Sequence, residues 1–69
     1  MESVSRQVVF ERDAGVCMEC WAQGFPGIAD PANWHLDHII PLKRNGEHSY
    51  ANVQVTHPAC NLKKGARVG

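Results

Sequence analysis

A carboxylate and an imidazole stand side by side in the middle of the chain, at Asp37 and His38. An aspartate oxygen is a hard ligand suited to a divalent cation, and a histidine has an unperturbed pKa near neutrality. Asn52, Asn61 and Lys64 follow at intervals that could complete a site around this pair. These residue types suit phosphodiester hydrolysis, which needs a deprotonated water and positive charge for the departing oxygen.

In such a site, Asp37 and Asn61 would offer two oxygen ligands to one magnesium-like cation, and His38 would be the general base. Asn52 lies just before an expected strand and is placed to orient His38. Each residue also has an ordinary structural role open to it, such as a turn or helix cap for an asparagine. Taken singly, Asn52 and Asn61 favour the ordinary role, and only the whole set favours catalysis.

Three cysteines and one histidine form two pairs with metal-ligand spacing. Two residues separate Cys17 from Cys20, and two separate His57 from Cys60. Three thiolates and one imidazole suit a closed tetrahedral structural zinc site with no open position for water. The alternative is a lone reactive cysteine pair near the other two residues by chance. We disfavour it because a chain of 69 residues buries a small core and needs a staple.

Length and composition restrict the class of protein further. A chain of 69 residues makes one domain at most, and its three cysteines cannot all pair in disulfides, which favours a reducing compartment. The sequence has no apolar run long enough to cross a membrane, and its first residues lack the apolar core of a signal peptide. We therefore expect a cytoplasmic, intracellular protein without a membrane partner.

The formal net charge is zero, which taken alone argues against nucleic-acid binding, but the charges are unevenly distributed. Residues 1–35 carry two basic and five acidic side chains, whereas residues 36–69 carry five basic and two acidic ones. A basic half around the Asp37–His38 pair suits a surface that faces phosphates. An ordinary solvated face explains the imbalance equally well. The candidate phosphate-binding residues are Lys43, Arg44, Lys63, Lys64 and Arg67.

The elements expected in the first half of the chain are one helix and one long loop. The spacing of apolar residues predicts a helix from Val4 to Asp13, with Ser3 or Ser5 as its N-terminal cap. Glycines and prolines predict a loop from Trp21 to Asn33. We interpret Trp21 and Phe25 as lids over the core rather than as platforms for stacking bases.

The second half reads as two strands followed by a helix. Strands are expected over 35–38 and 53–56, joined by a polar loop that turns at Asn45-Gly46 and includes a helical turn close to the second strand. Pro58 is well placed to begin the last helix, and Gly65 to cap its C-terminus.

The last helix would present two different faces to its surroundings. His57 and Cys60 are three residues apart and share a face. Asn61 lies about 100° further round, and Lys64 shares that second face with it. A zinc ion on the first face would therefore direct Asn61 and Lys64 toward the Asp37–His38 segment.

The order of these motifs is specific. It runs Cys17-x-x-Cys20, Leu36-Asp37-His38-Ile39-Ile40-Pro41-Leu42, Gly46, Asn52-Val53-Gln54 and Cys60-Asn61-x-x-Lys64-Gly65. This pattern resembles the HNH endonuclease family, over a core of about residues 6–67 in a single domain spanning residues 1–69. The resemblance implies an α+β fold: a small ββα-metal (His-Me finger) domain with an N-terminal helix and a structural zinc.

The resemblance also implies roles for matching positions. Asp37 and Asn61 would bind the catalytic cation, Mg²⁺ or Mn²⁺; His38 would be the general base, and Asn52 would hold it. The zinc-containing subgroup usually has a cysteine at the position of His57, and we expect Zn²⁺ to persist with the Cys3His set. Two other histidines, His35 and His48, match no essential position and are given no role.

We therefore predict a metal-dependent endonuclease, bacterial or phage-encoded, that hydrolyses phosphodiester bonds in DNA with little sequence specificity. One alternative is a zinc-stapled module that binds nucleic acid or protein without catalysis. Another is a nuclease subunit of a larger phage or restriction machine, whose partners supply targeting. A homodimer that makes paired nicks also stays open.

Overall fold

The computed structural model describes residues 2–68, with the side chains of residues 2–64. Two strands pair as one antiparallel sheet, in which His35 lies opposite Thr56 and His38 opposite Val53. This α+β architecture, with two strands followed by a helix, confirms the predicted fold class. In chain order the elements are α1 (Arg6–Arg12), α2 (Met18–Ala22), β1 (His35–His38), the 3-10 helices η1 (Leu42–Arg44) and η2 (Tyr50–Asn52), β2 (Val53–Thr56) and α3 (Pro58–Val68).

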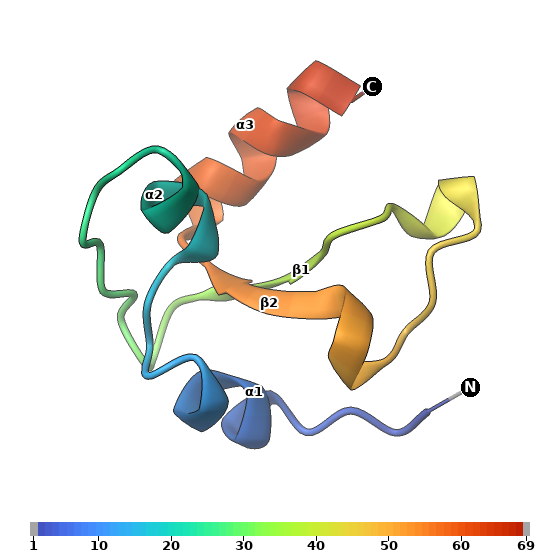
Figure 1. Ribbon diagram of the computed structural model, residues 1–69, viewed down its shortest axis with the longest axis horizontal. Helices are drawn as coiled ribbons and strands as arrows, with labels where there is room; N and C mark the ends of the chain where they lie inside the picture. The colour runs from blue at the N-terminus through green and yellow to red at the C-terminus, as the bar shows by residue number, and fades with distance from the viewer. Residues whose placement is uncertain (1, 69) are drawn as a thin grey trace.

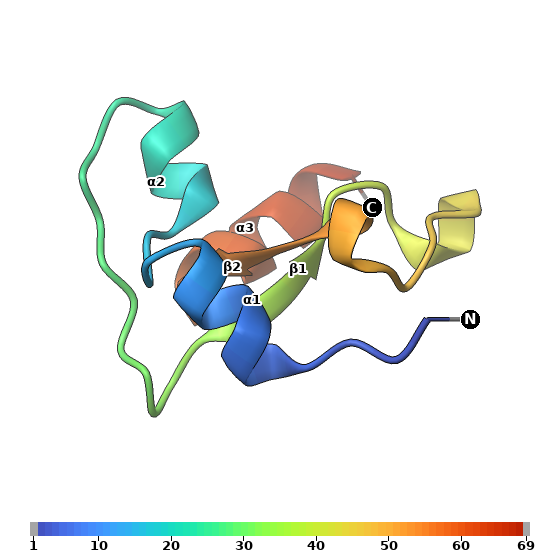
Figure 2. The ribbon, with the colours of Figure 1, turned by 60° about the horizontal axis from the view of Figure 1, so that its bottom comes forward.

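The sheet lies between α1 and α3, which cover opposite faces (Figures 1 and 2). Side chains alternate between the two faces of a strand. Val53 and Val55 therefore point to one face, where they are buried with Val9 of α1 in the apolar core. Asp37 and Gln54, paired across the strands, point to the other face, which carries α3. The sheet is apolar toward α1 and polar toward α3.

Helix α1 begins at Arg6, two residues later than the sequence predicts. Ser5 is its N-terminal cap, and the Ser5 Oγ accepts a hydrogen bond from the Val8 N–H at 3.3 Å. Val9 is fully buried, whereas Val8 is 48% exposed. The helix thus packs through Val9, with the partly buried Phe10 beside it against the core.

Residues at the end of α1 also bind the free edge of β2. The Arg12 guanidinium donates to the Val53 carbonyl at 2.8 Å, and Asp13 accepts from the Val55 N–H at 3.1 Å. Arg12 and Asp13 form an ion pair with each other. These bonds connect the helix to backbone groups of β2 that do not face β1.

The segment after Cys17 differs from the prediction. A short helix, α2, begins at Met18 and extends into the segment from Trp21 that the sequence predicts as a loop. The prediction that Trp21 and Phe25 cover the core is wrong, since these rings are 64% and 62% exposed. The core is already filled from the other side of the sheet, and the two cysteines fix the orientation of α2, so the aromatic rings face outward.

The loop between the strands turns where the sequence predicts. Asn45 adopts the left-handed conformation with φ of 66°, and a Cβ at Gly46 would overlap the carbonyl group of Ile40. Helix α3 begins at Pro58, as expected, but continues to Val68. The prediction that Gly65 caps this helix is therefore wrong, and the reason is that one glycine inside a helix costs only about 1 kcal/mol.

Candidate functional site

Four metal-binding side chains converge where α2 meets the start of α3. The ligand atoms of Cys17, Cys20, His57 and Cys60 all lie within 4.8 Å of one another. The sulfurs of Cys20 and Cys60 are 3.8 Å apart, and the Cys20 sulfur is 3.5 Å from Nδ1 of His57. A tetrahedral zinc with Zn–S bonds of about 2.3 Å holds two sulfurs about 3.8 Å apart. The Cys3His set therefore fits zinc in both chemistry and spacing.

The surroundings of this cluster orient its ligands. Nε2 of His57 lies 3.1 Å from the Ile28 carbonyl, and a hydrogen bond donated there leaves Nδ1 as the free donor atom on the side of the thiols. The backbone N–H of His57 donates to the Cys17 sulfur at 3.3 Å. A Cβ at Gly27 would lie 2.9 Å from the Cys20 sulfur, so this position has room only for glycine.

The thiols affect one another's ionisation. Burial alone would raise the pKa of Cys17, but hydrogen bonds from the backbones of His57 and Cys20 and from the neighbouring thiols lower it to about 7. Burial and the adjacent Cys17 and Cys60 raise the pKa of Cys20 to about 12. Only one of these two thiols is readily ionised without added positive charge. A divalent metal supplies that charge and favours the thiolates.

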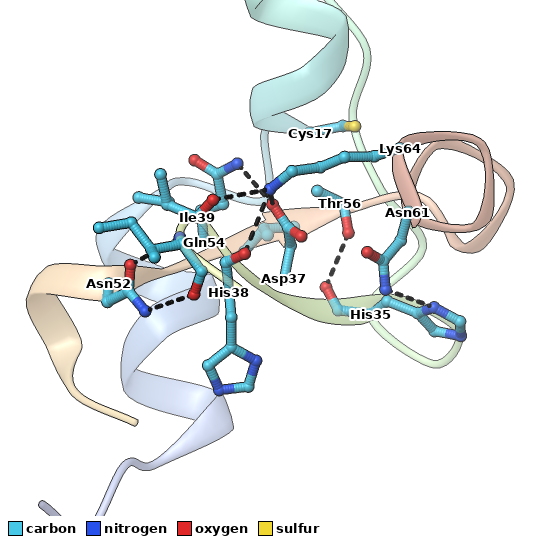
Figure 3. Close-up of polar contacts among 12 residues, drawn as sticks. Cys17, His35, Asp37, His38, Ile39, Asn52, Gln54, Thr56, Asn61 and Lys64 are labelled. Atoms are coloured by element: carbon cyan, nitrogen blue, oxygen red, sulfur yellow. Dashed lines mark hydrogen bonds and ion pairs between the residues drawn. The ribbon is translucent and has the colours of Figure 1, made fainter. Parts of the chain in front are cut away.

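On the other side of α3, Asp37 is buried and paired. The carboxylate is 4% exposed, and its Oδ2 accepts a hydrogen bond from Gln54 at 2.8 Å. The Lys64 ammonium lies 2.8 Å from the same oxygen and also donates to the His38 carbonyl at 3.2 Å (Figure 3). Asp37 is thus a buried carboxylate that is already paired with a positive charge from this chain.

Asn61 projects from α3 toward the first residue of β1. Its Nδ2 lies 3.1 Å from Nδ1 of His35 (Figure 3). Asn61 also lines a cavity of 270 Å³ together with Asp37, His38, Lys64 and Lys43. Helix α3 therefore directs Asn61 and Lys64 toward the strand that carries Asp37, as the helix geometry predicts.

The His38 ring points away from the Asp37 carboxylate and the Lys64 ammonium (Figure 3). Its Nε2 lies 3.0 Å from Nδ1 of His48, in the loop before η2. Burial and then the neighbouring His48 lower the pKa of His38 below its ordinary 6.5, with a smaller opposing effect of Asp37. The sequence alone gives His48 no role. The contact between His38 and His48 forms only because the loop between them closes, and the spacing of residues along the chain does not indicate it.

Asn52 binds main chain on both sides of that loop. Its Oδ1 accepts from the Ile40 N–H at 2.9 Å, and its Nδ2 donates to the carbonyls of Ile40 at 3.1 Å and Glu47 at 2.7 Å. The Asn52 carbonyl accepts from the Ile39 N–H at 2.9 Å. These bonds hold the backbone that follows His38 rather than its ring.

The basic candidates occupy different surroundings. Lys43 and Arg44 are exposed in η1, and Lys63 is exposed on α3. Lys64 is half-buried in its ion pair with Asp37. The side chain of Arg67 lies outside the described residues.

Comparison with known protein families identifies a match for most of the chain. The family model for the HNH endonuclease matches residues 17–67, which is well over half of the chain and includes the cysteine pairs, both strands and most of α3. No curated protein and no solved structure matches the chain. Among residues 2–68, no helix has the length and apolar character that crossing a membrane requires.

Proposed function

Because the chain belongs to the HNH endonuclease family, we propose that it is a metal-dependent DNA endonuclease that hydrolyses phosphodiester bonds and is stapled by a structural zinc. One observation carries this proposal: Asp37, His38 and Asn61 line a single cavity of 270 Å³. A zinc-binding module without catalysis would have no use for a buried carboxylate that shares an opening with the amide of Asn61 and is followed directly by a histidine.

Asp37 and Asn61 are the residues that would hold a catalytic cation, Mg²⁺ or Mn²⁺. Both offer oxygen atoms, which these hard cations prefer, and they come from different elements that meet at the cavity. The ammonium of Lys64 at 2.8 Å from Asp37 indicates that this carboxylate favours a positive partner. When bound, the cation supplies positive charge for the phosphate and its departing oxygen.

His38 would accept the proton of the attacking water. A general base must be neutral, and the lowered pKa of His38 keeps its ring in that form at pH 7. The bonds from Asn52 to Ile39 and Ile40 fix the backbone directly after His38. Asn52 is thus a positioning residue that acts through the main chain.

The exposed cations would bind the substrate backbone. Lys43 lines the cavity, and Arg44 and Lys63 are exposed on the two elements beside it. Contacts with phosphates fix the position of a duplex without reading its bases, so we expect cleavage with little sequence preference. Lys64 and Arg67 complete the proposed phosphate-binding set.

The test is cleavage of supercoiled plasmid by zinc-loaded protein with and without Mg²⁺ or Mn²⁺. We expect metal-dependent nicking that falls about 10²–10⁴-fold in His38→Ala, because a positioned general base contributes about that much. Asp37→Asn should lose activity as well. Gln7→Ala, on the helix at the opposite face of the sheet, is the matched control. A folded, zinc-containing wild type without cleavage would contradict the proposal.

A further inference from the structure

We propose that His48 is a positioning residue for the general base: it accepts a hydrogen bond from Nε2 of His38 and thereby leaves Nδ1 of His38 as the basic nitrogen. The proposal rests on the proposed function, because it concerns how His38 is set up to deprotonate water. It assigns a task to a histidine outside the motifs that identify the family.

The contact between the two rings is close and sheltered. Nε2 of His38 and Nδ1 of His48 are 3.0 Å apart, which is an ordinary hydrogen-bond length. The ring centroids are 5.2 Å apart and the ring planes are inclined by 41°, so the bond lies along the ring edges rather than between stacked faces. Both residues are half-buried.

The loop that carries His48 is held at both ends by one side chain. Asn52 binds Ile40, two residues after His38, and Glu47, one residue before His48. All three of these bonds are with main-chain groups, so the backbone on both sides of the histidine pair is fixed. The distance between the two imidazoles is therefore fixed by the hydrogen bonds of the buried Asn52 side chain rather than left to a free loop.

The turn at Asn45 and Gly46 also holds the loop in its closed path. Asn45 takes a left-handed conformation, and Gly46 donates its N–H to the Pro41 carbonyl at 3.0 Å. A side chain at Gly46 would collide with the backbone of Ile40. The chain thus returns toward β1 along one path, and that path brings His48 to His38.

The positions of the protons follow from the chemistry of imidazole. A neutral ring has one N–H and one nitrogen lone pair, so one ring of the pair must donate and the other accept. If His48 donated, the remaining proton of His38 would lie on Nδ1, and the ring could not accept a proton from water. If His38 donates from Nε2, its Nδ1 lone pair is free. Only the second arrangement suits a general base, and His48 then carries its own proton on Nε2.

The kinetic experiment uses two variants of similar size at the same position. His48→Asn supplies an oxygen near the place of Nδ1 and can accept the bond, whereas His48→Leu cannot. We expect His48→Leu to lower kcat about 30-fold, within the contribution of a general base, with KM for plasmid DNA unchanged. His48→Asn should keep kcat within about threefold of the wild type. Circular dichroism and zinc content verify that each variant is folded.

A second measurement reads the tautomer directly and does not depend on a variant. Long-range ¹H–¹⁵N correlation spectra of the zinc-loaded wild type should show His38 protonated at Nε2 and His48 accepting at Nδ1. His38 protonated at Nδ1 would overturn the proposal. So would a wild type that cleaves DNA while His48→Leu cleaves equally fast, and that result would leave the proposed function intact. A wild type that fails to cleave with any divalent cation would overturn the proposed function, and this inference with it.

Discussion

The two sides of α3 bear two candidate metal centres that are built in opposite ways. Toward α2, four donor atoms meet within 4.8 Å, and the spare nitrogen of His57 is bound to a backbone carbonyl. Toward β1, the Asp37 carboxylate is paired with Lys64, and Asn61 is held through its amide nitrogen against His35. The first centre brings its four donor atoms together, whereas in the second Asp37 must release Lys64 before that oxygen can bind an ion.

This difference separates architecture from chemistry. Three thiolates and one imidazole fill all four positions around a zinc ion and leave none for substrate. Such a site suits a structural metal that stabilises a small core. A carboxylate that holds a lysine can release it when a divalent cation or a phosphate approaches. Changes on the zinc side should therefore affect the fold, and changes on the Asp37 side should affect function with smaller effects on stability.

The largest effect is expected from loss of the zinc ligands. Cys60→Ala, or chelation of the wild type, should abolish the fold, because zinc binding to such a set contributes about 10 kcal/mol or more to folding. Circular dichroism and near-UV spectra with zinc analysis provide the measurement. A cooperatively folded, zinc-free protein would contradict the assignment of a structural role to the cysteine side of α3.

Next in size is the loss of the Asp37 carboxylate. The pair is well buried, with side-chain exposures of 4% for Asp37 and 16% for Lys64. Asp37→Ala should destabilise the fold by about 3 kcal/mol, because the lysine is left unpaired. Adding Lys64→Met should restore most of that loss, as denaturant titration would show. Equal stability of the single and double variants would contradict the pairing.

Lys64→Met alone tests whether Lys64 competes with a divalent cation for the Asp37 carboxylate. With the ammonium gone, no cation among the described side chains of residues 2–64 forms an ion pair with Asp37 and competes with Mg²⁺ or Mn²⁺. We expect divalent-cation affinity to increase about tenfold, which corresponds to about 1.4 kcal/mol. Calorimetric titration of zinc-loaded protein measures this directly. Unchanged or weaker affinity would show that Lys64 does not compete with the metal.

The ionisation of His38 should shift the pH profile of cleavage. Burial, followed by His48, lowers the pKa of this ring below 6.5. More than half of the rings are therefore neutral at pH 6.5, and the acid limb of kcat/KM, which reports the free enzyme, should have its midpoint below that value. Neutral His38 likewise favours the fold above pH 6.5, and this contribution is lost as the pH falls through the lowered pKa. A midpoint above 6.5 would contradict the expectation.

The smallest effect is expected at the exposed cations. Lys63→Ala should weaken DNA binding similarly for all sequences and reduce the slope of log affinity against log salt by about 0.9. Fluorescence anisotropy at several salt concentrations measures the slope. Glu11→Gln, exposed on α1, is a charge-changing control on the other side of the sheet. A sequence-dependent loss of binding would indicate that Lys63 contacts bases.

The spacing of residues along the chain was enough to predict the contacts that depend on the geometry of a single helix. Residues three apart on a helix share a face, so the convergence of His57 and Cys60 could be foreseen, as could the start of α3 at Pro58. Asn61 and Lys64 reach β1 for the same reason. Their catalytic and metal-binding roles stay predictions.

Features that depend on distant parts of the chain could not be predicted in this way. The contact between His38 and His48 exists only because the loop closes on Asn52. The exposure of Trp21 and Phe25 depends on a core that fills from α1 and the sheet. Hydrophobicity alone does not say which apolar residues a core of this size leaves outside.

The ion pair at the end of α1 has a consequence beyond packing. An open strand edge is a template on which another polypeptide can add a strand, and this is a common route to aggregation. On β2, the outward carbonyl of Val53 and N–H of Val55 are already bound by Arg12 and Asp13. An incoming strand would have to displace both side chains from these backbone groups before it could form its first ladder bonds there. The chain thus guards this edge against self-polymerisation with two charged side chains.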